Sequence, residues 1–492
     1  MKTKPLVWGH KGSTWLLIIL AFALALRLVF FTGTDASDPL AYTKYANMLA
    51  KGEPINVERG DAFRIGLLLP VSVLYRMFGF NEFSSNVLVI LASLASIVLI
   101  YKFGVMLFNE KAGLLSAFLL SFFPFDVLYS TRLMTELPSA FFVALSVYLF
   151  LKSEKTANKR KSYAYCLFSG LAVGMAYLIK ELSVLIILFF IAYAIYNKKI
   201  RARYWLIPLG FAVIFFAESL YFLKTTGNML FRFDTITTAT YSIVLENYGR
   251  GSLPFSLFHF FYIAFTDSSL GLFYPFIFMA IFFCIARKKK DTYSLLLWLI
   301  PLFLYISFGS ISLTKYILFP VTTRLFSIIT FPGILLLAYF LSQEDKLIKR
   351  TLMPIILILL FVTSIGYIHV SRQKSLIDSE KATYKFIKGL GNNIYTDERT
   401  FNVFDYLSGY DLPDSIRKFN HYEPLNPQNT YAVELGKITD SYIVVNRKLV
   451  NFYLSYKKGA KFPAEIFNVP KEWALKKSVG KGENGIEVYY IP

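Results

Sequence analysis

The chain has 492 residues, of which 55% are hydrophobic and 18% aromatic, and its mean hydropathy is +0.49. Soluble domains are about half apolar, so this composition excludes a soluble globular protein and indicates a polytopic membrane protein. The formal net charge is +20, but residues 369–492 hold 18 Lys and Arg against 14 Asp and Glu, a net +4. The basic excess therefore belongs mainly to the apolar part, where cytoplasmic anchoring explains it, and no nucleic-acid partner is implied.

Eleven apolar segments approach the ~20 residues that span a bilayer. In chain order they are 15–31, 87–108, 112–125, 137–151, 163–179, 182–196, 205–223, 270–286, 293–308, 325–341 and 352–368. Several are shorter than a full span, so the count could change by one or two. We expect a multi-pass α-helical membrane domain over residues 1–368 with about 11 transmembrane helices.

The distribution of Lys and Arg predicts the orientation of the chain. The segments 1–14, 109–111, 152–162, 197–204, 287–292 and 342–351 hold 20 Lys and Arg in 52 residues, whereas the remaining connecting segments hold 12 in 130. Short loops rich in Lys and Arg stay in the cytoplasm. We therefore expect a cytoplasmic N-terminus in the cell membrane and, after an odd number of spans, an extracytoplasmic C-terminal domain.

Two long loops are expected on the outer side, over residues 34–86 and 224–269. Within the first, residues 42–52 have helical spacing and predict an amphipathic helix along the membrane surface. Residues 64–80 are apolar but contain a proline and an arginine. They predict a juxtamembrane helix, with a re-entrant segment as the alternative.

The C-terminal residues 369–492 alternate helical and strand-like patterns, which predict a small extracytoplasmic α/β domain. Helices are expected over 375–391 and 399–409, and strands over 392–398, 440–446 and 485–492. The chain has only two cysteines, Cys166 and Cys284, both near expected span ends. No disulfide framework and no zinc site are therefore predicted.

Ionisable side chains inside or at the ends of membrane spans are costly and are the first candidates for function. Six lie toward the outer leaflet of the predicted topology, namely Arg27, Asp38, Arg132, Glu136, Lys180 and Glu181, and Glu218 lies in the seventh span. Arg132 and Glu136 are four residues apart, a helical spacing that allows them to pair; the alternative is a salt bridge that only closes the loop. Lys180 suits a phosphate, or it is a lysine snorkelling from a helix end.

Five segments together resemble the GT-C integral-membrane glycosyltransferases, in particular protein O-mannosyltransferases and lipid A aminoarabinose transferases, of the glycosyltransferase family 39 or 83-like type. They read RLVFF, SDPLAYTKYANMLAKG, RIGLLLPVSVLYRMFGFNE, YSTRLMTELPSAFF and GLAVGMAYLIKE, in the order and on the side of the membrane that such enzymes require. The resemblance implies a sugar donor on polyprenyl or dolichyl phosphate. It also implies transfer, at the outer face, to a protein, lipid or polysaccharide acceptor.

The resemblance also implies roles for individual residues. It makes Asp38 the catalytic base of an inverting displacement, because a carboxylate can take the proton of the acceptor hydroxyl. It places Asp35, Tyr42, Arg132 and Glu136 in support of the active site. It assigns the lipid-phosphate and donor site to Arg64, Lys180, Glu181, Lys315, Tyr316 and Arg324.

The sequence departs from the family pattern in two places. The usual Asp-Glu pair is Asp38-Pro39 here, so Asp35 is the nearest acid that could substitute. The Trp-Trp-Asp-Tyr-Gly signature of oligosaccharyltransferases is absent, which disfavours en bloc transfer to asparagine. No cofactor is certain and no metal ligand is assigned, although a divalent cation stays open as a requirement. A transporter or flippase of envelope lipids and a non-catalytic envelope scaffold are the alternative functions.

Overall fold

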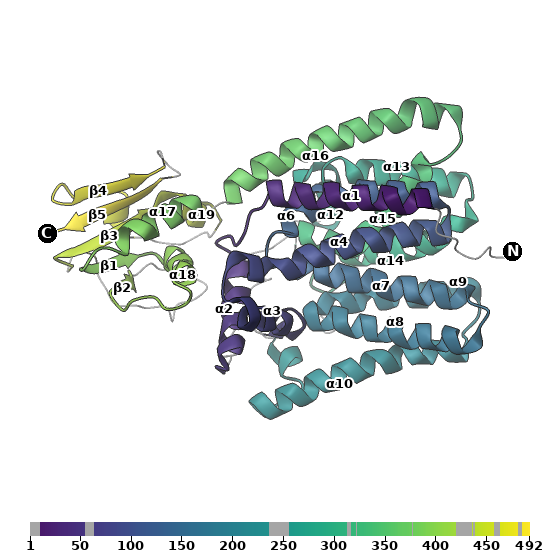
Figure 1. Cartoon of the computed structure of the whole chain (residues 1–492), viewed down its shortest axis with the longest axis horizontal. Coiled ribbons are helices and arrows are strands. Elements are labelled where there is room, and N and C mark those ends of the chain that lie inside the picture. Colours follow the sequence, from purple (N-terminus) through teal and green to yellow (C-terminus); the bar gives the residue numbers. More distant parts are fainter. Residues whose placement is uncertain are drawn as a thin grey trace. The chain divides into compact units, whose positions relative to one another are not determined.

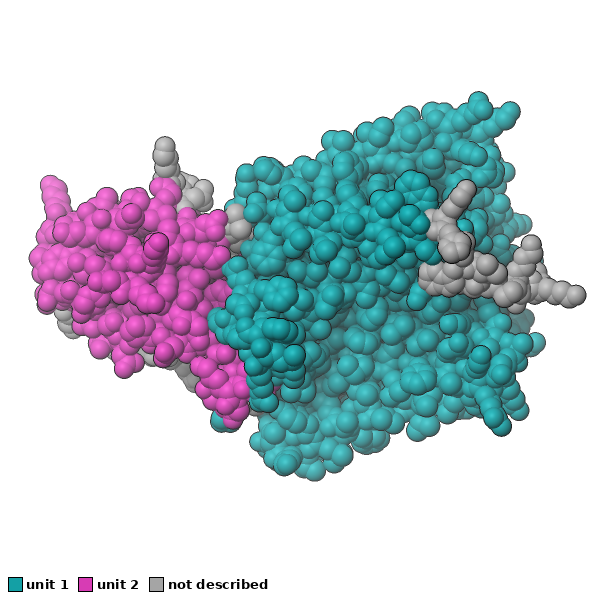
Figure 2. Space-filling model, in the orientation of Figure 1, with its two compact units in different colours: residues 1–33, 54–374 teal, residues 34–53, 375–492 magenta. Residues whose placement is uncertain are grey.

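The computed structural model describes residues 10–54, 63–235, 255–311, 316–320, 322–375, 377–419, 435, 438–456, 463–480 and 485–492. The chain divides into two compact units (Figure 2). The membrane unit comprises Met1–Gly33 and Pro54–Lys374, and the C-terminal unit comprises Thr34–Glu53 and Ser375–Pro492. The helix expected along the membrane surface is thus grouped with the C-terminal unit, whereas we expected residues 34–86 to belong to the membrane domain.

The membrane unit is a bundle of helices (Figure 1). They are α1 (His10–Val29), α3 (Ile65–Phe78), α4 (Glu82–Leu107), α5 (Glu110–Ser121), α6 (Pro124–Tyr129), α7 (Glu136–Lys155), α8 (Lys159–Ile179), α9 (Ile187–Asn197), α10 (Leu206–Thr226), α12 (His259–Thr266), α13 (Phe273–Ala286), α14 (Tyr293–Phe308), α15 (Ser327–Leu341) and α16 (Met353–Ser375). Two 3-10 turns, η2 (Glu181–Ile186) and η7 (Thr323–Phe326), precede α9 and α15. The multi-pass membrane fold is confirmed.

Eight helical segments among the described residues are long and apolar enough to cross a membrane, and Ile65–Phe78, Glu181–Asn197 and Phe273–Ala286 are shorter apolar helices. All eleven predicted segments coincide with helices. The exact number of spans stays a prediction. The predicted segment 112–125 covers two helices instead of one, because Pro124 lies in the first turn of α6 and ends the pattern of α5.

Asparagine side chains begin several of these helices. Asn81 accepts a hydrogen bond from the Ser84 amide at 2.9 Å, and the Ser84 hydroxyl accepts one from the Asn81 amide, so that together they form a capping box at the start of α4. The side chains of Asn109 and Asn158 accept hydrogen bonds from the amides of Ala112 and Lys161 and so cap α5 and α8, without the reciprocal bond of a capping box. These caps satisfy backbone donors that the apolar surroundings could not.

Glycines let α8 and α10 pack with their backbones close together. A Cβ atom at Gly170 would lie 2.1 Å from the carbonyl oxygen of Ile207, and one at Gly210 would lie 2.5 Å from that of Leu167. Small residues at such positions are typical of helix pairs in membranes, where association depends on close packing. This packing fixes the end of α8, which carries part of the candidate site.

We expect Gly170→Ala to destabilise the membrane unit by about 1–3 kcal/mol, because the added methyl group must separate α8 from α10. Thermal unfolding of the purified protein in detergent measures the change. Gly366→Ala in α16 is the matched control, since no atom lies within 4 Å of its added Cβ. That control should be neutral or stabilising by up to about 1 kcal/mol, and equal effects of the two changes would contradict the packing argument.

The C-terminal unit contains a five-stranded sheet with the order β2-β1-β3-β5-β4. Its strands are β1 (Asn393–Thr396), β2 (Ile416–Lys418), β3 (Ser441–Asn446), β4 (Ala474–Val479) and β5 (Ile486–Ile491). β1 pairs in parallel with β2 and β3, whereas β5 is antiparallel to β3 and β4. The helices of the unit are α2 (Asp38–Lys51), α17 (Asp378–Ile387), α18 (Glu398–Leu407) and α19 (Arg447–Tyr456).

Both faces of this sheet are covered. Along β3, Ile443 and Val445 point into one apolar core, and Val444 points into the other. The first core also contains Val450 of α19, and the second contains Tyr384 of α17 and Phe404 of α18. The α/β fold of the C-terminal residues is therefore as predicted, although β2, β4 and α19 were not among the predicted elements.

Candidate functional site

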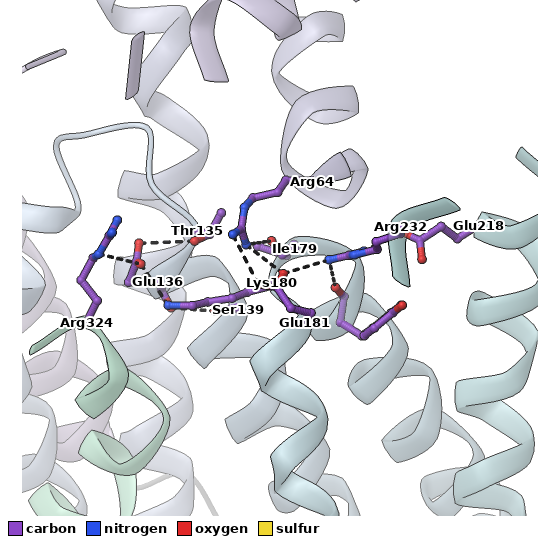
Figure 3. Close-up of polar contacts among 11 residues, drawn as sticks. Arg64, Thr135, Glu136, Ser139, Ile179, Lys180, Glu181, Glu218, Arg232 and Arg324 are labelled. Carbon is purple, nitrogen blue, oxygen red and sulfur yellow. Dashed lines mark hydrogen bonds and ion pairs between the residues drawn. The ribbon is translucent and has the colours of Figure 1, made fainter. Parts of the chain in front are cut away.

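Seven charged side chains lie in a row in the membrane unit (Figure 3), as two groups of ion pairs that meet where Lys180 and Glu181 are adjacent in the sequence. The row runs from Arg324 through Glu136, Lys180, Arg64, Glu181 and Arg232 to Glu218. It contains four cations and three carboxylates, so its net formal charge is +1. Because unpaired ions are very costly in apolar surroundings, the pairing of every carboxylate with at least one cation is what allows these charges to be buried.

Glu136 and Lys180 form one of the buried ion pairs of the row. Glu136 is the first residue of α7 and Lys180 follows the last residue of α8, so the short connection between these two helices brings the pair together. Lys180 Nζ donates to Glu136 Oε1 at 3.0 Å, and the two side chains are 9% and 1% exposed. Thr135 Oγ1 donates to the other carboxylate oxygen at 3.4 Å.

Arg324 is the most accessible cation of the row, with a side chain 35% exposed. It lies in η7 before α15, and its Nε is 3.8 Å from Glu136 Oε1. Glu136 thus has a cation on either side. Since Glu136 is buried beneath them, the groups left for an incoming ligand are the cations and not this carboxylate.

Glu181 connects the two halves of the row. Arg64, immediately before α3, donates to both Glu181 oxygens at 3.2 and 3.5 Å and to the carbonyl oxygen of Ile179 at 3.3 Å. Arg232 donates to the same carboxylate at 3.4 Å. Arg232 also pairs with Glu218, so two carboxylates balance the two arginines, and Glu181 serves to position both guanidinium groups.

Sequence reasoning missed Arg232 and left Glu218 without a partner. Arg232 Nη1 donates to Glu218 Oε1 at 2.5 Å, its Nη2 donates to the carbonyl oxygen of Tyr177 at 2.8 Å, and its guanidinium lies 4.4 Å from the Tyr177 ring centroid. Arg232 follows Gly227, where the chain turns back after α10. A carboxylate in an apolar helix, such as Glu218, needs a counter-charge. The sequence could have predicted this pair, because Arg232 is the first basic residue after the turn at Gly227.

Arg27 belongs to a separate buried cluster instead of the row. All five of its donor positions are used, by Ser93, the carbonyl oxygens of Ala23 and Ser121, and the carboxylate of Asp126. The Arg27 and Asp126 side chains are 0% and 5% exposed. This cluster joins α1, α4, α5 and α6 and satisfies its own charges, so we interpret it as a structural connection.

The expected helical pair of Arg132 and Glu136 does not form. Arg132 lies in the turn between α6 and α7, and Glu136 begins α7, so the two residues do not share a helix. Arg132 Nε instead donates to Thr32 Oγ1 at 3.2 Å. The four-residue spacing was misleading because the residues between them are not helical.

The acids of the first loop lie in the C-terminal unit. Asp38 is the first residue of α2 and is partly exposed, Tyr42 is buried on the same helix, and Asp35 accepts a hydrogen bond from the Ser37 hydroxyl. Tyr316 is 63% exposed and donates to the carbonyl oxygen of Phe308 at 2.7 Å. Lys315 lies outside the described residues. Among the residues that are described, no three His, Cys, Asp or Glu side chains gather as metal ligands.

Known proteins share a family-model match and a fold with this chain. Residues 69–222 match the family model described as dolichyl-phosphate-mannose-protein mannosyltransferase. A search of curated proteins found no match. The apo structure of ArnT from Cupriavidus metallidurans is similar over 98% of both chains, with a TM-score of 0.62 and 14% identity.

The chain has the GT-C fold. ArnT from the same organism bound to undecaprenyl phosphate gives a TM-score of 0.60 at 12% identity, covering 97% of this chain and 98% of that one. The archaeal oligosaccharyltransferase AglB from Archaeoglobus fulgidus, in complex with an inhibitory peptide and a dolichol-phosphate, gives 0.58 at 12% identity, covering 97% and 74%. The predicted resemblance to GT-C glycosyltransferases is confirmed in the fold along the chain and in the family match over residues 69–222.

In this GT-C chain, we expect Lys180→Met to lower the free energy of unfolding by about 3–5 kcal/mol, because Glu136 loses the ammonium group that compensates its burial. The contact with Arg324 persists in this variant, so the lower end of the range is expected. Thermal unfolding in detergent measures the loss. The double variant Glu136→Gln with Lys180→Met removes both charges and should recover most of it, and no recovery would contradict the pairing.

Proposed function

We propose that the chain transfers a sugar from a polyprenyl- or dolichyl-phosphate donor to an acceptor on the outer face of the membrane, with inversion at the anomeric carbon. The observation that carries this proposal is the row of seven charges with a net formal charge of +1 in a membrane unit of GT-C fold. Two similar structures contain undecaprenyl phosphate or dolichol-phosphate. Both ligands carry an anion on a long apolar chain, which matches a cationic site in a bilayer.

In the proposed mechanism, cations of the row bind the phosphate of the donor. Arg324 and Arg64 are the more accessible of them, with side chains 35% and 17% exposed, and Lys180 contributes its charge from beneath. As the bond between the anomeric carbon and the phosphate oxygen breaks, negative charge grows on the lipid phosphate, and fixed cations stabilise it. Glu136 and Glu181 position these cations.

The proposed base is Asp38. Its carboxylate takes the proton of the acceptor hydroxyl while the hydroxyl oxygen attacks the anomeric carbon. An attack opposite the departing phosphate inverts the anomeric centre in a single displacement. Asp35, Tyr42 and Arg132 are proposed to support this reaction, and Tyr316 and Lys315 are retained as further candidates for contact with the donor.

The proposed orientation follows from the distribution of Lys and Arg. The N-terminus then lies in the cytoplasm, and residues 369–492 form an extracytoplasmic domain. A divalent cation stays open as an additional requirement of the reaction. The acceptor is a protein, a lipid or a polysaccharide, and mass spectrometry of envelope glycans from cells with and without the chain would identify it.

Asp38→Asn should abolish the glycan product that depends on the chain, because an amide cannot accept the proton of the acceptor hydroxyl at neutral pH. Mass spectrometry of glycans from cells that express only the variant measures the product. Asp414→Asn, at an exposed acid of the same unit, is the matched control and should leave the product unchanged. Undiminished product in the Asp38→Asn cells, with normal membrane insertion of the variant, would refute the assignment of Asp38 as the catalytic base.

Undecaprenyl phosphate should raise the thermal unfolding midpoint of the purified chain, because a ligand that binds only the folded state stabilises it. Arg324→Gln removes a charged partner worth roughly 1.5–3 kcal/mol and should weaken binding on the order of tenfold to a hundredfold. Arg201→Gln is the matched control, since Arg201 pairs with Glu154 away from the row. Equal stabilisation of all three proteins would contradict the phosphate site.

A further inference from the structure

Helix α2 is attached to the C-terminal unit by specific side-chain contacts with α18 and with the turn that follows it. Within this unit, α2 packs against α18. Lys44 Nζ donates to Asp405 Oδ2 at 3.0 Å, and Tyr410 bonds to α2 through its hydroxyl. These contacts lie within the first two turns of α2, which begins at Asp38.

The Tyr410 hydroxyl bonds to two groups of α2. It donates to the carbonyl oxygen of Leu40 at 2.9 Å, and its oxygen lies 2.5 Å from Thr43 Oγ1. Thr43 is fully buried and also lies within bonding distance of the carbonyl oxygens of Pro39 and Leu40. Two hydroxyl protons are therefore shared among several acceptors in the first turn of α2, directly after the proposed base.

The backbone of Tyr410 adopts an unusual conformation to make this contact. Its φ is +63°, in the left-handed region that bulky residues rarely enter, and it follows Gly409, whose φ is +80°. The Tyr410 amide donates to the carbonyl oxygen of Asp405 at 2.8 Å, which ends α18. Uncommon backbone geometry of this kind occurs most often where function requires a particular side-chain placement.

We propose that Tyr410 is a positioning residue that fixes the first turn of α2, and with it Asp38, so that the C-terminal unit determines the orientation of the proposed base. This inference rests on the proposed function. A glycine at position 409 and a tyrosine hydroxyl at 410 provide what an exposed loop lacks, namely a rigid support with directional bonds. The Lys44–Asp405 pair is a second, charge-based contact along the same helix.

Tyr410→Phe tests the proposal without removing the ring. Thr43 retains backbone acceptors in this variant, so α2 keeps its hydrogen bonds and the chain should fold. We expect the amides of α2 to exchange hydrogen about tenfold faster in the full chain, and the dependent glycan product to fall about tenfold. Stabilisation by undecaprenyl phosphate should be unchanged, because the cationic row is intact.

Tyr442→Phe is the matched control, because it removes a hydroxyl from β3 of the same unit, where the ring contacts Tyr490. It should leave both exchange and product unchanged. Lys44→Asp should lower the product, and Asp405→Lys in the same chain should restore it by reforming the pair in reverse. A merely structural tyrosine would lower product and undecaprenyl-phosphate stabilisation together, and that result would overturn the positioning role.

Measuring Asp38→Asn beside these variants distinguishes the proposed role of Asp38 as the base from the proposed role of Tyr410 in positioning it. Loss of product in Asp38→Asn with wild-type product in Tyr410→Phe would overturn the positioning role and leave the proposed base intact. Full product in Asp38→Asn would overturn the base, and with it any role that Tyr410 has through that carboxylate. Loss in both, with the lipid-phosphate response retained and the charge reversal restoring product, supports the inference.

Discussion

The membrane unit depends on one electrostatic constraint, which is that charges buried among apolar helices must compensate one another. The row from Arg324 to Glu218 satisfies this constraint by pairing each carboxylate with cations contributed by segments far apart in the sequence. Each of these segments must therefore reach its position for any of the charges to be tolerated. The ends of α7 and α8, the segment before α3, the residues after α10 and the start of α15 are coupled through this row.

The same constraint distinguishes buried charges that only hold helices together from buried charges that are available to a ligand. Arg27 and Asp126 neutralise each other, and Arg27 uses every donor it has, so that cluster holds four helices together and leaves no charge for a ligand. The row instead has one cation more than it has carboxylates, and its most exposed member is Arg324. A surplus positive charge at low dielectric is favourable to a phosphate and unfavourable to most other ligands.

Sequence patterns predicted the helices of the bundle because long apolar runs leave few alternatives in a bilayer. They predicted β1, β3 and β5 because these strands are rich in branched and aromatic residues. They failed for β2, which has only three residues, and for β4, whose side chains are almost all exposed. The candidate site was predicted in its residue types but not in its pairs, since Lys180 and Glu136 are 44 residues apart and only the packing of α7 on α8 joins them.

The edge strand β4 affects whether the sheet of the C-terminal unit can pair with a strand of another chain. β4 lies at the end of the sheet, presents Lys476 and Lys477 in succession, and has an irregular register against β5 near these residues. Adjacent lysines and a bulge discourage the addition of a further strand from another chain. A domain concentrated in the two dimensions of a membrane surface meets copies of itself often, and at the β4 edge these features disfavour growth by strand pairing.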